Sequence, residues 1–431
     1  MPNQSFPWRR TFIIGLGFLG ISIIWPIFNQ YIPLFLQAGN PEFNAQLLRE
    51  GREIPNIVGF ALPPYIALFI MTWDNIINVF MQPWVGERSD RTWNRLGRRK
   101  GWILLGMPIA AIAFVFIPLA QSLLAIAVFI LITNFGMALF RSPTVAWLGD
   151  LFDVENRSKA NGVINLMGGL GGLLAYFGGG ILFNRLGREA PFFAGSIFLA
   201  IVSLAAVVLV KEPREIARNP SASTGVRANL RVVLNSQDRS ILFVLLGILL
   251  WFMAFNALET GLSSFAVFSL GMKAGDASIY AGGVNISFIL FAIPAGLLGT
   301  QIGRRRAIRI GLAGLTFTLL IGYFVVQNAL TFVLFLIPAG AFWAAVNVNS
   351  LPLVYDYGDE HKIGAYTGLY YFSSQLAAVL GPTLGGVLVT TLGSQYRWLF
   401  MFSTVFMALA FVAMTGVRAK QPQPQLALTA E

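Results

Sequence analysis

The chain alternates between long apolar runs and short polar connections along its whole length. A helix that crosses a bilayer needs about 20 apolar residues, and most of these runs reach that length. The pattern therefore predicts an all-α membrane protein with twelve transmembrane helices. The expected spans are residues 11–37, 57–85, 101–120, 122–149, 159–183, 191–210, 240–268, 277–300, 307–326, 328–355, 363–391 and 396–417.

One polar connection is much longer than the others. Residues 211–239 carry the Pro, Ser and Gly residues of a linker and divide the predicted helices into six and six. We therefore expect an N-terminal bundle over residues 1–210, a cytoplasmic linker over 211–239, and a C-terminal bundle with a short tail over 240–431.

An internal repeat supports this division. The run Arg98-Arg99-Lys100 recurs 206 residues later as Arg304-Arg305-Arg306. Parallel six-helix repeats occur in membrane transporters. Further matches at this offset relate Asp150 to Asp356, Asp153 to Asp359, Gly162 to Gly368 and Arg141 to Asn347, and a slightly larger offset relates Pro83 to Pro294 and Asp74 to Asn285.

Composition narrows the function classes. The chain is 56% hydrophobic and only 11% charged, against about 25% charged residues in soluble proteins. Its net charge of +11 comes from loops between spans rather than from one soluble face, which argues against nucleic acid as a partner. With no Cys and one His, His361, thiolate or imidazole metal sites are not expected, and we expect no cofactor.

The basic residues also predict an orientation. Most of the 30 Lys and Arg residues fall in connections on the same side as the N-terminus. The positive-inside rule then places both termini in the cytoplasm. We expect a multi-pass protein of the plasma (inner) membrane, surrounded by lipid and monomeric.

Two acids lie inside predicted spans. Asp74, Asn78 and Gln82 follow one stripe of the second helix, and Glu259 lies in the seventh. Ionisable residues inside a membrane are costly and usually functional. We predict that Asp74 and Glu259 carry a coupling proton. Glu259 could instead be an outer-gate residue, and for each acid the remaining alternative is a hydrogen-bonded structural role.

Arg141, in the fourth span, has two interpretations. Its planar fork could bind a substrate, or it could pair with Asp74. Aromatic faces with amide edges suit sugar rings, so the aromatic and amide residues in the polar spans are candidate ligands. The predicted substrate-binding residues are Asn29, Asn78, Gln82, Asn134, Arg141, Trp251, Asn256, Asn285, Trp343, Asn347, Tyr371 and Gln375.

Acids and bases at the predicted cytoplasmic ends indicate a gate. We expect Asp90 to accept from the amino end of the helix over 363–391, near Gly364 and Ala365, where the helix dipole is positive. Arginines of the two basic loops are expected to pair with nearby acids. The predicted gate residues are Gly86, Asp90, Arg91, Gly97, Arg98, Arg99, Asp150, Asp153, Arg157, Arg304, Arg305, Asp356 and Asp359.

The sequence around this gate resembles a known family. The run Gln82-Pro83, Gly86, Ser89-Asp90-Arg91-Thr92 and Gly97-Arg98-Arg99 resembles the loop signature of the major facilitator superfamily, in the variant of sucrose-transporter-like members of the glycoside–pentoside–hexuronide:cation symporter group. The resemblance implies two pseudo-symmetric bundles, alternating access, and a network that holds the outward-open state. One departure is that the acidic sodium positions of the melibiose permease branch are Asn78 and Gln82 here.

These observations predict a secondary active transporter, and in detail a proton-coupled symporter of a sugar or glycoside. An exporter or a lipid or drug carrier of the same fold is the alternative. A membrane enzyme or receptor is a distant one, because the chain shows no nucleophile or metal constellation.

Overall fold

The computed structural model describes residues 6–212, 239–357 and 363–418. In this part of the chain, eleven helices are long and apolar enough to cross a membrane, and a shorter apolar helix, α5, completes the predicted twelve. The first set comprises α1 (Trp8–Gln37), α2 (Pro41–Arg49), α3 (Pro64–Ile70), α4 (Trp73–Arg91), α5 (Lys100–Phe116), α6 (Leu123–Leu151), α7 (Val154–Leu173), the π-helical turn η1 (Leu174–Gly178), α8 (Gly179–Leu186) and α9 (Ala190–Leu209).

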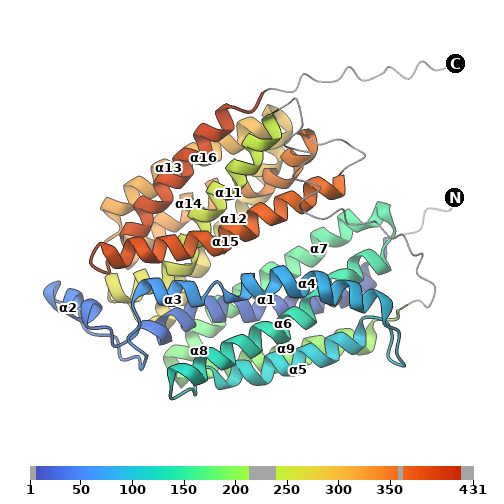
Figure 1. The fold of residues 1–431 in the computed structure, drawn as a ribbon, viewed down its shortest axis with the longest axis horizontal. Coiled ribbons are helices and arrows are strands. Elements are labelled where there is room, and N and C mark those ends of the chain that lie inside the picture. The colour runs from blue at the N-terminus through green and yellow to red at the C-terminus, as the bar shows by residue number, and fades with distance from the viewer. Residues whose placement is uncertain (1–5, 213–238, 358–362, 419–431) are drawn as a thin grey trace.

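The second set lies beside the first (Figure 1). It comprises α11 (Ser240–Ser264), the π-helical turn η2 (Phe265–Ser269), α12 (Ala274–Ile302), α13 (Arg304–Val325), α14 (Ala329–Tyr357), α15 (Ile363–Thr391) and α16 (Trp398–Thr415). We call the first set the N-half and the second the C-half.

The two halves are built by the same pairing scheme. In the N-half, α1 packs on α7 and α9, α6 packs on α4 and α5, and α5 packs on α9. In the C-half, α11 packs on α15 and α16, α14 packs on α12 and α13, and α13 packs on α16. Each N-half pair has its C-half counterpart at the same place in the helix order, as a parallel repeat requires.

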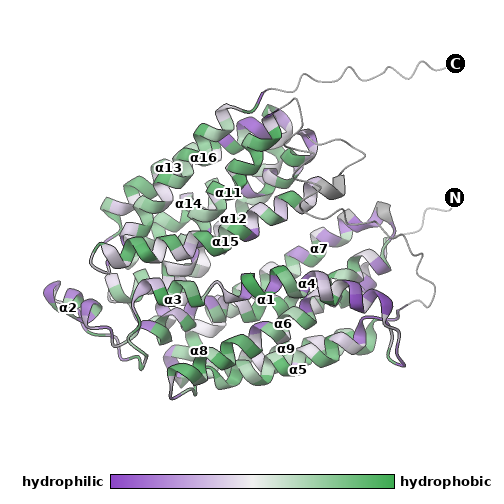
Figure 2. Cartoon of the chain, in the orientation of Figure 1, coloured by the Kyte–Doolittle hydropathy of each residue, from purple (hydrophilic) through white to green (hydrophobic). Residues whose placement is uncertain are grey.

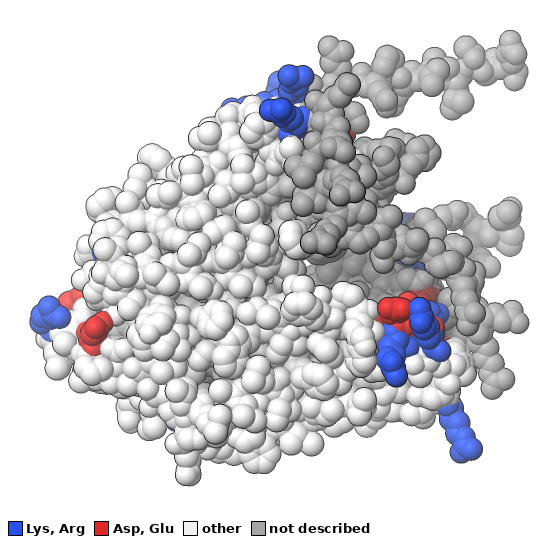
Figure 3. Space-filling model, viewed as in Figure 1, with Lys and Arg blue, Asp and Glu red and all other residues white. Residues whose placement is uncertain are grey.

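Apolar side chains cover the outside of the bundle. Hydrophobic residues occupy most of each helix, while hydrophilic residues gather at helix ends and on α2 (Figure 2). On the visible face, charged side chains lie only toward the two ends of the molecule (Figure 3). This distribution fits a bundle whose middle is surrounded by lipid tails.

The structure differs from the predicted spans in the second helix and the loop before it. The predicted start at residue 57 is wrong, because residues 51–63 are not helical and α3 begins only at Pro64. The loop before it contains α2, whose cap Asn40 accepts a hydrogen bond from the Glu42 N–H at 2.9 Å. α2 is short and buries only Phe43 and Leu47, so it carries no span signal.

Candidate functional site

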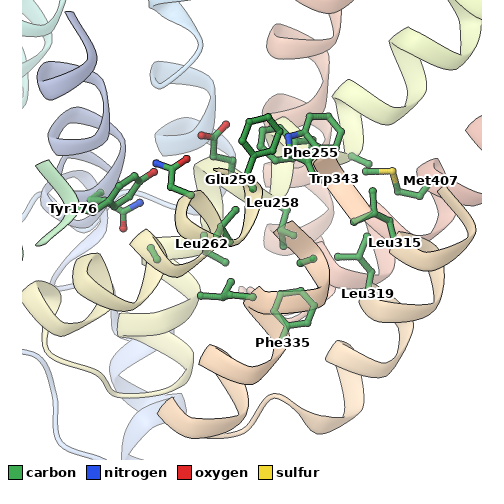
Figure 4. A pocket seen from close by; sticks show the side chains of 18 residues that line it. Tyr176, Phe255, Leu258, Glu259, Leu262, Leu315, Leu319, Phe335, Trp343 and Met407 are labelled. Atoms are coloured by element: carbon green, nitrogen blue, oxygen red, sulfur yellow. The ribbon is translucent and has the colours of Figure 1, made fainter. Parts of the chain in front are cut away.

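A cavity of about 180 Å³ lies where the C-half faces the N-half. Most of its wall comes from the C-half, and the N-half contributes Gln30 of α1 and Tyr176 of η1. Figure 4 shows Tyr176 and Glu259 on one side, with Leu315, Leu319 and other apolar side chains extending away from them. The other labelled apolar residues are Phe255, Leu258, Leu262, Phe335, Trp343 and Met407.

Polar groups are few in this cavity. Glu259 is the only charged side chain in its lining. Gln30 is 2% exposed, and its Oε1 has no hydrogen-bond partner among the described residues. Asn285 also lines the cavity, and Trp343 stacks on Phe255 with ring centroids 3.9 Å apart. A buried polar atom without a partner is costly, so Gln30 is suited to bind water or a ligand.

Three charged residues form an electrostatic group at the same level of the bundle. Asp74 of α4 interacts with Arg141 of α6 and, across the halves, with Glu259 of α11. Arg141 also interacts with Tyr371 of α15. The Asn75 Nδ2–H donates to the Asp74 carboxylate at 2.8 Å. The structure therefore brings Glu259 together with Asp74 and Arg141, whose pairing was one of the two interpretations of Arg141 from the sequence.

The other predicted ligands divide into three groups. Asn285 and Trp343 line the cavity, as does Glu259. Trp251 is fully buried beside Gly247 in the C-half core and lies outside the cavity lining. The third group also lies outside the cavity lining. Asn256 donates to the Phe252 carbonyl of its own helix, and Tyr371 is 53% exposed. The half-buried members of this group are Asn29, Asn347 and Gln375.

In the N-half, Asn78 and Asn134 are buried with free polar atoms. Asn78 Oδ1 and both amide atoms of Asn134 have no hydrogen-bond partner among the described residues. Gln82 is half-buried, and its carbonyl accepts from the Ser142 hydroxyl at 3.2 Å. Their roles as ligands stay predictions.

The halves are joined at the end opposite the basic loops. Gln37 of α1 donates to Ser264 Oγ at 3.0 Å and accepts from the Tyr396 hydroxyl, and both partners belong to the C-half. Nearby, Asn184 donates to Asp276 at 2.7 Å. Within the described residues, every side-chain hydrogen bond between the halves lies toward this end, which we call the closed end.

The loop helix α2 adds to this closure. Its Phe43 stacks on Phe268 of the C-half at 4.8 Å and lies 5.8 Å from the Tyr396 ring. Arg52, just after α2, donates to the carbonyls of Ser269 and Gln327. An N-half loop thus covers the outside of the closed end and packs on the C-half.

Close helix contact at the closed end depends on glycine. α8 and α12 meet at Gly180 and Gly275, where a Cβ on either residue would collide with the backbone oxygen of the other. Small residues allow membrane helices to approach in this way.

The opposite, basic end carries an ion-pair cluster within the N-half. Arg99 Nε donates to Asp150 Oδ2 at 2.7 Å, and its other nitrogens donate to Asp90 and to the Ser89 hydroxyl. Arg98 donates to Asp90 at 2.8 Å. Burial disfavours the charged form of Arg99, but Asp150 and then Asp90 outweigh it and raise the pKa of Arg99 above its ordinary value.

Glu212 completes this cluster from the start of the linker. Its carboxylate accepts from the backbone N–H groups of Arg98, Arg99 and Lys100, at the amino end of α5. It also accepts from the Trp147 indole at 2.8 Å. A Cβ on Gly97 would collide with this carboxylate, and Gly97 has φ +129°, so only glycine fits without strain.

The C-half contains an ion pair equivalent to one in the N-half cluster. Arg304 donates to Asp356, and these positions are the repeat counterparts of Arg98 and Asp150, whose charged atoms lie 4.0 Å apart. The offset found in the sequence therefore corresponds to equivalent ion pairs in the two halves.

The remaining predicted gate residues make local contacts. Arg91 pairs with Glu87 at 2.6 Å on the surface, and Arg157 donates to the carbonyls of Phe152 and Gly149. Arg305 donates to the Thr415 carbonyl at 3.5 Å. The Gly86 carbonyl accepts a hydrogen bond from the Ser89 hydroxyl. Asp153 precedes α7 and is exposed. Asp359 lies outside the described residues.

Sequence reasoning missed several residues at these sites. Gln37, Tyr396 and Glu212 are polar or acidic residues whose partners lie far away along the chain, so no local spacing identifies them. Gln30 and Tyr176 are polar groups inside apolar runs, which is only a weak indication that they line a cavity.

Comparisons with known proteins agree with this architecture. The family model described as "Major Facilitator Superfamily" matches residues 11–291 and 268–430. The chain is 24% identical over 397 residues to "Multidrug resistance protein 2" of Bacillus subtilis (strain 168), covering 90% of this chain and 89% of the relative.

Solved transporters share the fold at low identity. The nucleoside transporter NupG superposes with a TM-score of 0.67 at 16% identity, over 95% of this chain and 100% of that one. A bacterial homologue of the human lysosomal transporter Spinster, in an inward-facing and occupied conformation, gives 0.68 at 16%, over 95% and 97%. An auto-inhibited POT family peptide transporter gives 0.70 at 14%, over 97% and 98%.

Replacing Tyr396 should loosen the closed end. Tyr396→Phe removes the hydroxyl that donates to Gln37 and leaves a buried amide oxygen with one partner fewer. Loss of one such bond, about 1 kcal/mol, should shift the population toward opening by about fivefold. The chain has no Cys, so maleimide labelling of a Ser263→Cys reporter, buried at this end, should accelerate accordingly.

Tyr323→Phe is the matched control, because no hydrogen bond to its hydroxyl occurs within the described residues. Equal labelling rates in the two variants would show that the Gln37 contact does not hold the halves together.

Removing the acid of the buried pair should destabilise the N-half. Asp150→Asn leaves the Arg99 guanidinium, which is 4% exposed, without its main charged partner. We expect a loss of about 2 kcal/mol or more, seen as a drop of several degrees in Tm of the purified protein. Glu87→Gln breaks the exposed pair with Arg91 and should change Tm little. Equal effects of both substitutions would contradict the structural role of the cluster.

Proposed function

Because the chain belongs to the Major Facilitator Superfamily, and is therefore a membrane transporter, we propose that it is a proton-coupled carrier of an amphipathic organic cation. The observation that carries this proposal is Glu259, the single charged group in the lining of a largely apolar and aromatic cavity between the halves. The substrate would place its positive charge near Glu259 and a ring in the apolar part of the cavity.

The size and lining of the cavity support a ring-bearing substrate. An apolar cavity of about 150 Å³ holds a benzene molecule, and this one is about 180 Å³. Leu315, Leu319, Phe335 and Met407 offer no hydrogen bonds. Hydroxyl groups placed against them would lose their water partners at a cost of about 1–3 kcal/mol each. The name of the Bacillus subtilis relative, a multidrug resistance protein, is consistent with substrates of this kind.

The charged group supports coupling to protons. Asp74 and Glu259 repel each other across the halves, while Arg141 attracts Asp74. A proton on Asp74 or a cation beside Glu259 relieves the same repulsion, so the occupancy of one site alters the affinity of the other. Such a reciprocal free energy is what coupled transport requires.

The arrangement of the halves supports alternating access. With the basic end in the cytoplasm, as the positive-inside rule predicts, contacts at the opposite end close the outer side. We therefore assign an inward-facing state as part of this proposal. In this state, Asp90 pairs with Arg98 and Arg99 of its own half. Asp90 would then close the cytoplasmic side only in the outward-open state.

A sugar or glycoside is the second candidate substrate. The observation that favours it is the polar part of the cavity, where Gln30, Asn285 and Tyr176 lie near the stacked Trp343–Phe255 pair. Amide and hydroxyl groups beside aromatic rings suit a sugar. The two candidates differ in which part of the cavity binds the substrate.

The substrate proposal is tested by binding. Tetraphenylphosphonium, an apolar monocation, should stabilise the purified protein against heat, whereas a disaccharide should not. Glu259→Gln should weaken tetraphenylphosphonium binding by about tenfold or more, because the charge partner is lost. Glu53→Gln, at an exposed loop acid, is the control and should bind normally. Stabilisation by the disaccharide alone would favour the sugar symporter.

The coupling proposal is tested by transport. In proteoliposomes, Asp74→Asn should abolish accumulation driven by a pH gradient, yet leave exchange at equal concentrations largely intact. Glu259→Gln should lower both activities, because Glu259 contacts the substrate. If Asp74→Asn still accumulates substrate, and Glu259→Gln exchanges normally but does not accumulate it, the coupling proton belongs to Glu259.

A further inference from the structure

A second cavity, outside the transport path, lies at the basic end of the N-half. It has a volume of about 590 Å³ and lies between the first turns of α1 and the last turn of α9. Its wall includes Trp8, Arg9, Arg10 and Ile13 from α1, and Leu209 and Lys211 from the end of α9 and the residues that follow. We refer to these six residues as the α1–α9 groove.

The charge of the α1–α9 groove is positive. Arg9, Arg10 and Lys211 are all exposed, and none of them forms an ion pair with a described residue. The acid that follows, Glu212, accepts hydrogen bonds from the amino end of α5 and from Trp147 instead. Three cations therefore face one cavity, and no described residue supplies a counter-charge to them.

The apolar part of the groove continues onto the outer surface of the bundle. Trp8 is 58% exposed, and Leu209 and the neighbouring Phe12 and Val208 are also exposed. Trp residues are enriched where a helix meets the headgroup region of a membrane. The groove thus has a cationic part at the helix ends and an apolar part along the surface that faces lipid tails.

We propose that the α1–α9 groove binds an anionic phospholipid of the cytoplasmic leaflet. Arg9, Arg10 and Lys211 would bind the phosphate of the headgroup, and Trp8, Ile13 and Leu209 would contact the glycerol and the first part of an acyl chain. A free anion would satisfy the cations but not the apolar wall. A zwitterionic lipid would cover the wall but place its own positive charge beside three others.

Lipid crosslinking tests this assignment on the unmodified protein. The full chain is reconstituted in nanodiscs with a trace of photoactivatable phosphatidylglycerol, and the labelled peptides are identified. Label on peptides containing residues 7–13 or 209–211 is expected, and excess unlabelled phosphatidylglycerol should compete at least tenfold better than phosphatidylcholine. Label confined to other peptides, equal competition by phosphatidylcholine, or equal competition by inorganic phosphate would each overturn the proposal.

A charge-matched pair of variants sharpens the test. The triple variant Arg9→Gln, Arg10→Gln, Lys211→Gln should reduce the specific label about tenfold or more, since each basic residue near an anionic surface contributes about 1 kcal/mol. The control is Arg95→Gln, Lys159→Gln, Arg306→Gln, which removes three exposed basic residues elsewhere. Its label should stay at the level of the unmodified protein. Equal losses in both variants would show that net charge, and not the groove, attracts the lipid.

Discussion

A polar group inside a bilayer must face protein or enclosed water, because lipid tails offer no hydrogen bonds. This constraint places the chemistry of the protein between its two halves. The outside of the bundle is apolar, whereas Asp74 interacts with Arg141 of its own half and with Glu259 of the other half. The residues that are most costly to bury are thus grouped between the halves, away from lipid tails.

The same constraint explains why the two ends of the molecule behave differently. At the closed end, polar groups such as Gln37 find partners in the other half, so separation breaks these hydrogen bonds. At the basic end, Arg99 and Arg304 find their acids within their own half. Breaking a buried ion pair costs several kcal/mol of free energy. Separating the two halves does not incur this cost where each charge is paired within its own half. Separation of the halves at the basic end would therefore leave these two ion pairs intact.

The sequence predicted the features that depend on local pattern. Span length, the repeat offset and the intramembrane acids are visible in short windows, and the equivalent pairs of Asp150 and Asp356 confirm the offset. It did not predict α2, which is too short and polar to resemble a span. Nor did it separate Trp343, in the cavity wall, from Trp251, in the C-half core. In a helix that is apolar on every side, periodicity does not reveal which face meets the cavity.

Under the proposed function, the divergence of the internal repeat divides two tasks, proton coupling and substrate binding. The repeat counterparts of Asp74 and Arg141 are Asn285 and Asn347, so the C-half has lost these charges. Asn285 still lines the cavity, next to the apolar recess that the C-half has formed from α13, α14 and α16. In the proposed mechanism, the charged N-half responds to the proton, while the neutral and apolar recess holds the ring of the substrate without competing for that proton. In that mechanism Glu259, which belongs to the C-half but interacts with Asp74, links the two tasks, because a change in its charge changes the electrostatic energy of Asp74.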